Sequence, residues 1–482
     1  MKLNKIFIAA ILGLLTISSC SEERLIEKPV DQFTLDEAIR TETDMRSVLN
    51  GTYDQYSSAA GFGTDVLVFG DLISDNVFIT AKPSDVAYRN TGFLNWSQDI
   101  SDFGMLRPIY SGIILSNIVI NDTNLPESTT VNNYKGEARI ARAVGYFYLL
   151  NFYSPNPTSG VNQEYGVPLN LDNYNASAKL PRATVAEVYD QIISDLTTGI
   201  SLMTNEQPQN KGYLSPTAAR LLLSRVYLTR GKAGDYEKAV QYADAVINSA
   251  GTNGFDFVSK DDYVNYFSST DILVSEDRPE TVWEINMNGT PGENTSVNNH
   301  LAAFYSNTGA KRRFLFTQGF YSSFPATDIR RSLFNTGGTP SEDEPRGVWT
   351  KKYSRTTSEG NYTLNTKVLR MSEAYLNKIE AMFKLGKTSE ALTQLNEFAA
   401  SRGGSTYSSA TLENILTERR KEFFAEGQRF FDLKRNNLGF HKDTNCYSII
   451  CDVPGDSKLF VIPMPQSEMN LNPNMAQYPD WK

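Results

Sequence analysis

Two long segments of this 482-residue chain each predict a pair of antiparallel helices joined by a glycine turn. They read SPTAARLLLSRVYLTRGKAGDYEKAVQYADAVINS and KVLRMSEAYLNKIEAMFKLGKTSEALTQLNEFAASRG. In both, a glycine (Gly234 or Gly386) stands five residues before an alanine (Ala239 or Ala391) of the second helix. Glycine closes the turn, and alanine lets two helices approach closely. Such a pair buries its apolar face only by stacking on neighbours, so the chain must contain further helices.

The glycine turn resembles that of tetratricopeptide repeats, but the two copies lie much farther apart than the about 34 residues of an uninterrupted array. Apolar stripes predict more helices at 34–56, with Thr34 as N-cap, at 105–121 and at 134–153. Thr184 and Glu187 form a predicted capping box. We therefore expect a helical scaffold over residues 34–56, 105–153, 184–249 and 366–435, interrupted by loop-rich inserts at 57–104, 154–183 and 250–365.

These inserts carry glycine, asparagine and aromatic residues, with a few short strands such as ETVWEIN. Within that strand, Trp283 is expected to be buried. Loops held on a rigid scaffold are where binding sites concentrate. The inserts are therefore expected to form the ligand face of a single domain, residues 34–482.

The N-terminus has the layout of a secretory signal peptide, residues 1–19. Lys2 and Lys5 precede an apolar run from Ile6 to Ile17. That run is shorter than the roughly 20 residues a membrane-spanning helix needs. The residues before Cys20 resemble the lipobox of bacterial lipoproteins, which predicts lipidation of Cys20 and a tether over residues 20–33. An ordinary signal peptide beside an incidental cysteine is the alternative.

Two or more acyl chains on Cys20 would hold the protein stably on a membrane. The sequence Ser21-Glu22-Glu23 resembles the acidic tag that sends some lipoproteins to the outer face of the outer membrane, although a solvated linker reads the same way. We expect a lipid-anchored outer-membrane protein that faces the cell exterior.

The formal net charge of −9 disfavours nucleic acid as a partner. Cys446 and Cys451 lie close together, which in an exported protein favours a local disulfide over a metal site. Only His300 and His441 could serve a zinc site or a histidine-based triad. We expect no cofactor and leave open a structural calcium ion in an Asp/Asn-rich loop, since no EF-hand loop is present.

An ordered set of motifs makes nearly the whole chain resemble the SusD/RagB family, outer-membrane nutrient-binding lipoproteins that partner TonB-dependent transporters. Besides the lipobox, the motifs are GDLISDNV, IYSGIILSNIVI, GEARIARAVGYFYLLNFY, YGVPL, RATVAEVYDQIISDL, LSPTAARLLLSRVYLTRG, VLRMSEAYLNKIEA, LTERRKEFFAEGQRFFDLKR and LFVIPMPQSEMNLNPNM.

This resemblance implies an all-α core of four tetratricopeptide-like helix pairs, an α-α superhelix, with elaborated loops and a few short strands. It implies that the scaffold packs against a SusC-like TonB-dependent transporter. The other side would hold an oligosaccharide, or a peptide in some members, for nutrient uptake and polysaccharide utilisation. Such a protein captures and hands over its ligand without catalysis.

A glycan site needs an aromatic platform with polar groups at its rim. The candidates in the inserts are Trp96, Tyr88, Tyr305, Phe320 and Tyr321, with Asp75 and Asn76 as polar contacts. Each has an alternative, because a loop aromatic can plug the core and a carboxylate can cap a turn. Asp328 and Arg330 are weaker candidates, and we interpret the charged segment 418–435 as structural.

Two other classes of function stay open. A glycoside hydrolase needs only two well-placed carboxylates, which spacing along the chain cannot exclude. Against it stands the absence of a nucleophile elbow, a phosphate loop or a histidine-rich cluster. A pure interaction scaffold would keep the anchor and the repeats but would have no exposed aromatic platform.

Overall fold

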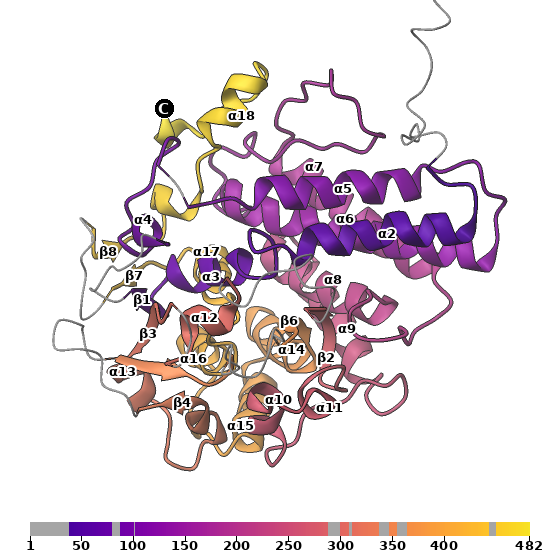
Figure 1. Ribbon diagram of the computed structural model, residues 1–482. Helices are drawn as coiled ribbons and strands as arrows, with labels where there is room; N and C mark the ends of the chain where they lie inside the picture. Colours follow the sequence, from indigo (N-terminus) through magenta and orange to yellow (C-terminus); the bar gives the residue numbers. More distant parts are fainter. Residues whose placement is uncertain are drawn as a thin grey trace, which may run out of the picture.

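A computed structural model describes residues 38–79, 87–100, 102–287, 299–307, 311–336, 347–353, 364–442 and 450–482 (Figure 1). The predicted signal peptide, Cys20, the tether, Thr34 and Cys446 lie outside these residues. Cys451 is disulfide-bonded, and its pairing with Cys446 stays a prediction. In the described ranges, no helix is both long and apolar enough to cross a membrane.

Four helix pairs follow one another along the chain and pack in that order. They are α2 (Glu42–Ser57) with α5 (Leu106–Ile120), α6 (Thr129–Tyr153) with α7 (Val185–Leu202), α8 (Pro216–Arg230) with α9 (Asp235–Ile247), and α14 (Met371–Lys384) with α15 (Thr388–Ser401). Each pair also contacts the next, through α5 and α6, α7 and α8, and α9 and α14. In Figure 1 the purple and magenta pairs lie above the orange one. The predicted all-α scaffold of helix pairs is confirmed, including two pairs without the glycine signature.

Local signals explain where these helices begin and end. Thr184 and Glu187 form the predicted capping box of α7, and Ser215 caps α8 before Pro216. Gly234 and Gly386 adopt φ angles of +82° and +78°, which favour glycine.

Two predicted helix starts are wrong. Helix α2 begins after Thr41, which forms a capping box with Asp44, later than the expected position 34. Helix α6 begins five residues before the expected position 134, because the Ser128 side chain caps it by accepting from the Val131 amide.

The predicted scaffold segment 366–435 does not start as a helix. Residues Thr366–Arg370 form strand β6, which pairs antiparallel with β2 (Thr281–Ile285). Every side chain of both strands is buried. Pairing and burial against β2 therefore stabilise residues 366–370 as a strand, although their local sequence pattern favoured a helix. Trp283 of β2 is fully buried, as predicted.

The inserts form a second layer beside the helix pairs, around a sheet of order β1-β3-β5-β4 in which neighbours are antiparallel. Its strands are β1 (Val77–Ile79), β3 (Phe314–Thr317), β5 (Gly347–Thr350) and β4 (Phe334–Asn335). A separate pair joins β7 (Phe440–His441) to β8 (Asp452–Val453). Short helices around them are α3 (Asp65–Leu72), α4 (Arg89–Gly92), α10 (Tyr263–Ser268), α11 (Ile272–Ser275), α12 (Leu301–Tyr305) and α13 (Gln318–Ser322). The C-terminal part adds α16 (Leu412–Glu422), α17 (Arg429–Arg435) and α18 (Gln466–Leu471).

The segment 418–435 is part of the core, in agreement with its structural interpretation. Phe424 and Phe430 are fully buried. The Glu422 carboxylate lies between three buried arginines, at 3.4 Å from Arg330 Nη1, 3.2 Å from Arg370 Nη1 and 3.3 Å from Arg402 Nε. Burial alone would raise the pKa of Glu422, but these three cations hold it well below its usual range. This network ties α16 to the inserts.

Candidate functional site

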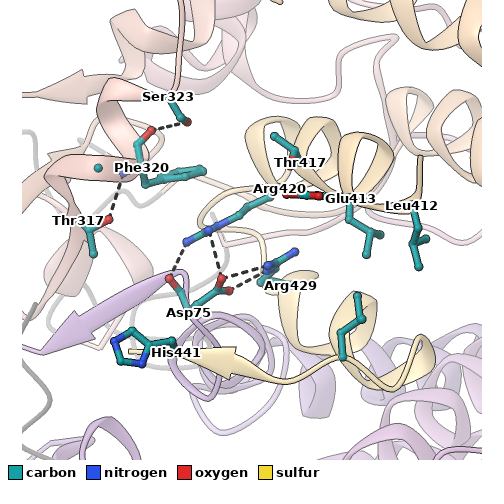
Figure 2. A pocket seen from close by; sticks show the side chains of 13 residues that line it. Asp75, Thr317, Phe320, Ser323, Leu412, Glu413, Thr417, Arg420, Arg429 and His441 are labelled. Carbon is teal, nitrogen blue, oxygen red and sulfur yellow. Dashed lines mark hydrogen bonds and ion pairs between the residues drawn. The ribbon is translucent and has the colours of Figure 1, made fainter. Parts of the chain in front are cut away.

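One pocket of about 760 Å³ brings together Asp75 and Phe320, two of the predicted ligand contacts (Figure 2). It lies where the inserts 57–104 and 250–365 meet the C-terminal helices. Its lining consists of Asp75, Thr317, Gly319, Phe320, Ser323, Leu412, Glu413, Leu416, Thr417, Arg420, Arg429, Leu438 and His441.

Close backbone packing brings Asp75 to this place. A Cβ atom at Gly70 of α3 would overlap the carbonyl group of Gly427, so only glycine allows the two segments to touch. Gly427 itself has a φ of +72°, in the left-handed region. This contact brings α3 against the start of α17. Asp75, just after α3, therefore faces Arg429 at the first position of α17.

Asp75 is held by two arginines. Arg429 Nε and Nη2 donate to its two carboxylate oxygens at 2.7 and 3.0 Å. Arg420 Nη1 lies 3.1 Å from Oδ2. Burial alone would raise the pKa of Asp75, but the charges of Arg420 and Arg429 outweigh it and hold that pKa well below its usual range. Asp75 is therefore an ionised acceptor.

Arg420 connects the pocket to Asn76, which was predicted as a polar ligand contact. Its Nε donates to Asn76 Oδ1 at 2.8 Å, and its Nη2 donates to the Asp75 carbonyl at 2.6 Å. The guanidinium carbon lies 4.6 Å from the centroid of the Phe320 ring, a cation–π contact. Asn76 is itself buried and also donates to Asp71 Oδ1 at 2.6 Å. It therefore positions Arg420 and does not line the pocket.

Hydroxyl groups stand on the wall formed by β3 and α13. Thr317 Oγ1 accepts from the Phe320 amide at 3.1 Å, which leaves its proton to be donated. The Ser323 hydroxyl donates to the Phe320 carbonyl at 2.7 Å, which leaves its lone pairs to accept. Figure 2 shows both groups hydrogen-bonded to the Phe320 backbone. This wall can exchange hydrogen bonds in both directions.

The opposite wall combines apolar and polar side chains. Leu412 and Leu416 come from α16 together with Thr417 and the exposed Glu413. His441 of β7 lies nearby, with its Nδ1 2.6 Å from Asp452 Oδ1. The pocket therefore offers apolar contact area surrounded by donors and acceptors, which is the arrangement that a sugar ring requires.

Three of the predicted aromatic contacts are core residues outside the pocket, and a fourth, Phe320, lines the pocket but is only 6% exposed. Trp96, predicted as an exposed platform, is 5% exposed and packs edge-on against Phe103. The Tyr88 hydroxyl donates to Asp65 Oδ1 at 2.6 Å, and the Tyr305 hydroxyl donates to Asp71 Oδ2 at 3.0 Å.

The exposure predicted for these four rings is wrong. Trp96, Tyr88 and Tyr305 pack into the core around α3, and Phe320 packs against Phe334 and Phe424. Tyr321 is half-buried, with the Arg331 guanidinium carbon 4.5 Å from its ring centroid. It is not part of the pocket lining. The weaker candidates Asp328 and Arg330 form a fully buried ion pair at 2.7 Å, so they serve structure.

Sequence reasoning missed Arg420 and Arg429, because both lie in the segment interpreted as structural. Consecutive residues of a helix point about 100° apart. Arg419 turns inward to Asp432 at 3.1 Å, whereas the Arg420 side chain is 21% exposed and reaches the pocket. The paired arginines in ERRKE were a usable signal, since only one of them can face the core.

Across the described ranges, no three His, Cys, Asp or Glu side chains come together to hold a metal ion. The structural calcium ion stays an untested prediction.

Two family models match the chain. One, described as starch-binding associating with outer membrane, matches residues 27–228, and one described as the SusD family matches residues 331–481. A SusD-like protein of Bacteroides ovatus is 25% identical over 360 residues, which are 67% of this chain but only 63% of that relative. SusD-like protein P2 of Formosa agariphila is 25% identical over 482 residues, covering 91% of this chain and 92% of the relative.

Solved structures show the same fold. A SusD superfamily protein from Bacteroides vulgatus superposes with a TM-score of 0.80 at 27% identity, covering 92% of this chain and 100% of that one. Surface glycan-binding protein A from Bacteroides uniformis superposes with a TM-score of 0.73 at 21% identity, covering 92% and 100%. At that identity the second likeness concerns the fold alone.

Proposed function

Because the chain belongs to the SusD/RagB family, we propose that it is a surface lipoprotein that captures oligosaccharides. In this proposal Cys20 carries the lipid anchor, and the protein faces outward from the outer membrane. It delivers its ligand to a SusC-like TonB-dependent transporter for nutrient uptake.

The observation that carries the binding role is the pocket around Asp75. Sugars present apolar C–H faces and a ring of hydroxyl groups. The Asp75 carboxylate accepts hydrogen bonds, while Thr317 and Ser323 offer a donor and an acceptor. Leu412 and Leu438, which line the pocket and are partly exposed, supply apolar contact. A pocket of about 760 Å³ falls in the size range of ligand sites.

Capture without cleavage is supported by the charge state of the pocket. A glycosidase needs one carboxyl group that stays protonated to act as general acid, with a raised pKa. In Asp75 the pKa is instead lowered by two arginines. The other carboxylate of the lining, Glu413, is exposed. The proposed protein therefore holds its ligand unchanged.

The test is a binding screen of the purified full-length protein against plant, host and microbial oligosaccharides. Short peptides are included, and the products are analysed for every hit. Binding of one glycan class without cleavage is the expected result. Cleavage would support the hydrolase alternative instead, and binding of peptides alone would support a peptide-capturing protein.

A further inference from the structure

The charged side chains that line the pocket balance one another. Arg420 and Arg429 are positive, and Asp75 and Glu413 are negative. Asp75 contacts both arginines, at 3.1 and 2.7 Å. These four side chains therefore sum to no net charge.

All three nitrogens of Arg420, and the Nε–Nη2 edge of Arg429, face the protein itself. All three nitrogens of Arg420 contact Asp75 or Asn76. Arg429 presents its Nε and Nη2 to the two carboxylate oxygens of Asp75, in a two-pronged pairing. Arginine recognises carboxylate and sulfate groups through this same fork. An anionic ligand would have to compete with Asp75 for it.

We infer that the pocket selects uncharged oligosaccharides and discriminates against uronic acids and sulfated sugars. The inference rests on the proposed function, because it specifies the ligand class of the same pocket. An acidic sugar must either displace Asp75 from Arg429 or lie beside Asp75 and Glu413 without a counter-charge. Both arrangements cost free energy, since a desolvated carboxylate without its partner is destabilising.

Neutral sugars meet no such cost. Their hydroxyl groups can donate to the outer lone pairs of Asp75 and Ser323 and can accept from Thr317. Their C–H faces can lie against Leu412 or Leu438, which line the pocket and are partly exposed. The pocket uses its arginines to hold an acceptor in place and not to bind an anion.

Equilibrium titrations of the full-length protein with matched oligosaccharide pairs test this selectivity. The pairs are xylo-oligosaccharides with and without glucuronate side groups, and galactan oligosaccharides with and without sulfate. They are titrated within the wider neutral and acidic panel used for the capture screen. We expect the tightest ligands of the panel to be neutral. Within each pair that binds, the affinity for the neutral member should be higher than that for its acidic partner by about tenfold or more.

The outcomes separate the two proposals. Equal or tighter binding of acidic ligands would overturn the selectivity while leaving glycan capture intact. Absence of any glycan binding across the whole panel would overturn capture, and the selectivity with it.

Two charge variants sharpen the test. Asp75→Asn leaves both arginines without their carboxylate and is expected to raise affinity for the sulfated probe about tenfold. Glu413→Gln changes an exposed group. It is expected to raise the affinity for the sulfated probe a few-fold without loss of stability. Asp190→Asn is the matched control, because Asp190 also pairs with an arginine, Arg230 at 3.0 Å, but lies outside the pocket.

The Glu413 variant decides the question if Asp75→Asn does not fold. A sulfated probe that binds Glu413→Gln no better than Asp190→Asn would contradict the inference. Higher affinity in Glu413→Gln alone would support it.

Discussion

Arg429 donates two hydrogen bonds to the Asp75 carboxylate, from Nε to Oδ1 at 2.7 Å and from Nη2 to Oδ2 at 3.0 Å. This pair joins helix α17 to the segment after α3. The two residues are far apart in the chain and meet at the edge of the pocket. This ion pair is mostly buried, with exposed side-chain fractions of 13% and 17%. Its disruption should therefore affect both stability and ligand binding.

Arg429→Gln should destabilise the fold by about 3–5 kcal/mol, because it leaves a mostly buried carboxylate with one partner fewer. The pKa of Asp75 is lowered in the folded protein, so its contribution to stability is present above its ordinary value of 3.8 and is lost as the pH falls below it. In the variant the folded-state pKa of Asp75 should move back toward 3.8, so this acid loss should be smaller and should end at a higher pH. Unfolding free energies between pH 2 and 7 would measure both effects, and an unchanged acid profile would contradict the pairing.

Trp96→Ala should unfold at a markedly lower temperature, with a cost of about 3–5 kcal/mol, because the indole is buried against Phe103. Trp96→Phe should recover part of this loss. Thermal unfolding of both variants checks the expectation. Normal stability with weakened ligand binding would instead restore Trp96 as an exposed binding platform.

Glu422→Gln should cost about 3–5 kcal/mol, since three buried arginines lose a shared counter-ion. The matched control is Glu390→Gln, which changes an exposed glutamate of α15 and should shift stability by less than about 0.5 kcal/mol. Urea unfolding of the two variants compares them directly. Equal stability would show that the network is dispensable.

Asp71 should make the protein less stable as the pH rises from about 4 to 7. Burial raises the pKa of Asp71 to about 7, so the folded state holds a proton that the unfolded state has already released. Each such proton contributes a slope of up to about 1.4 kcal/mol per pH unit. Asp71→Asn should flatten the slope across this window. An identical slope in variant and parent would mean that Asp71 is ionised throughout.

Cys20→Ala should release the protein from the membrane, because the predicted lipid is its proposed anchor. Fractionation of cells that express each form would show this, with a Cys451→Ala variant as the control for loss of a cysteine. Retention of Cys20→Ala in the outer membrane would show that a partner, and not the lipid, holds the protein.

Local signals in the sequence predicted the scaffold well, whereas features that depend on tertiary contacts were missed. Thr184 with Glu187, and the glycines at 234 and 386, act within a few residues of their own position, so their effect can be read from the chain. Strand β6 exists because β2 pairs with it, and β2 lies far away in sequence.

Dependence on tertiary contacts also explains why some predicted site residues line the pocket and others lie in the core. Asp75 and Phe320 line the pocket, and their contact with a ligand stays a prediction. Trp96 was an equally reasonable candidate, but whether a loop aromatic faces solvent depends on packing against α3. Arg429 becomes a pocket residue only once α17 and the end of α3 are brought together.

The most direct test of a glycan site in this pocket is to fill the pocket with a large side chain and measure ligand affinity. Thr417→Trp places an indole in the pocket from α16, and Thr393→Trp makes the same change at an exposed position of α15 outside it. The oligosaccharide found in the binding screen should lose at least about tenfold in affinity for Thr417→Trp and bind Thr393→Trp like the parent. Equal binding to all three proteins would contradict a glycan site in this pocket.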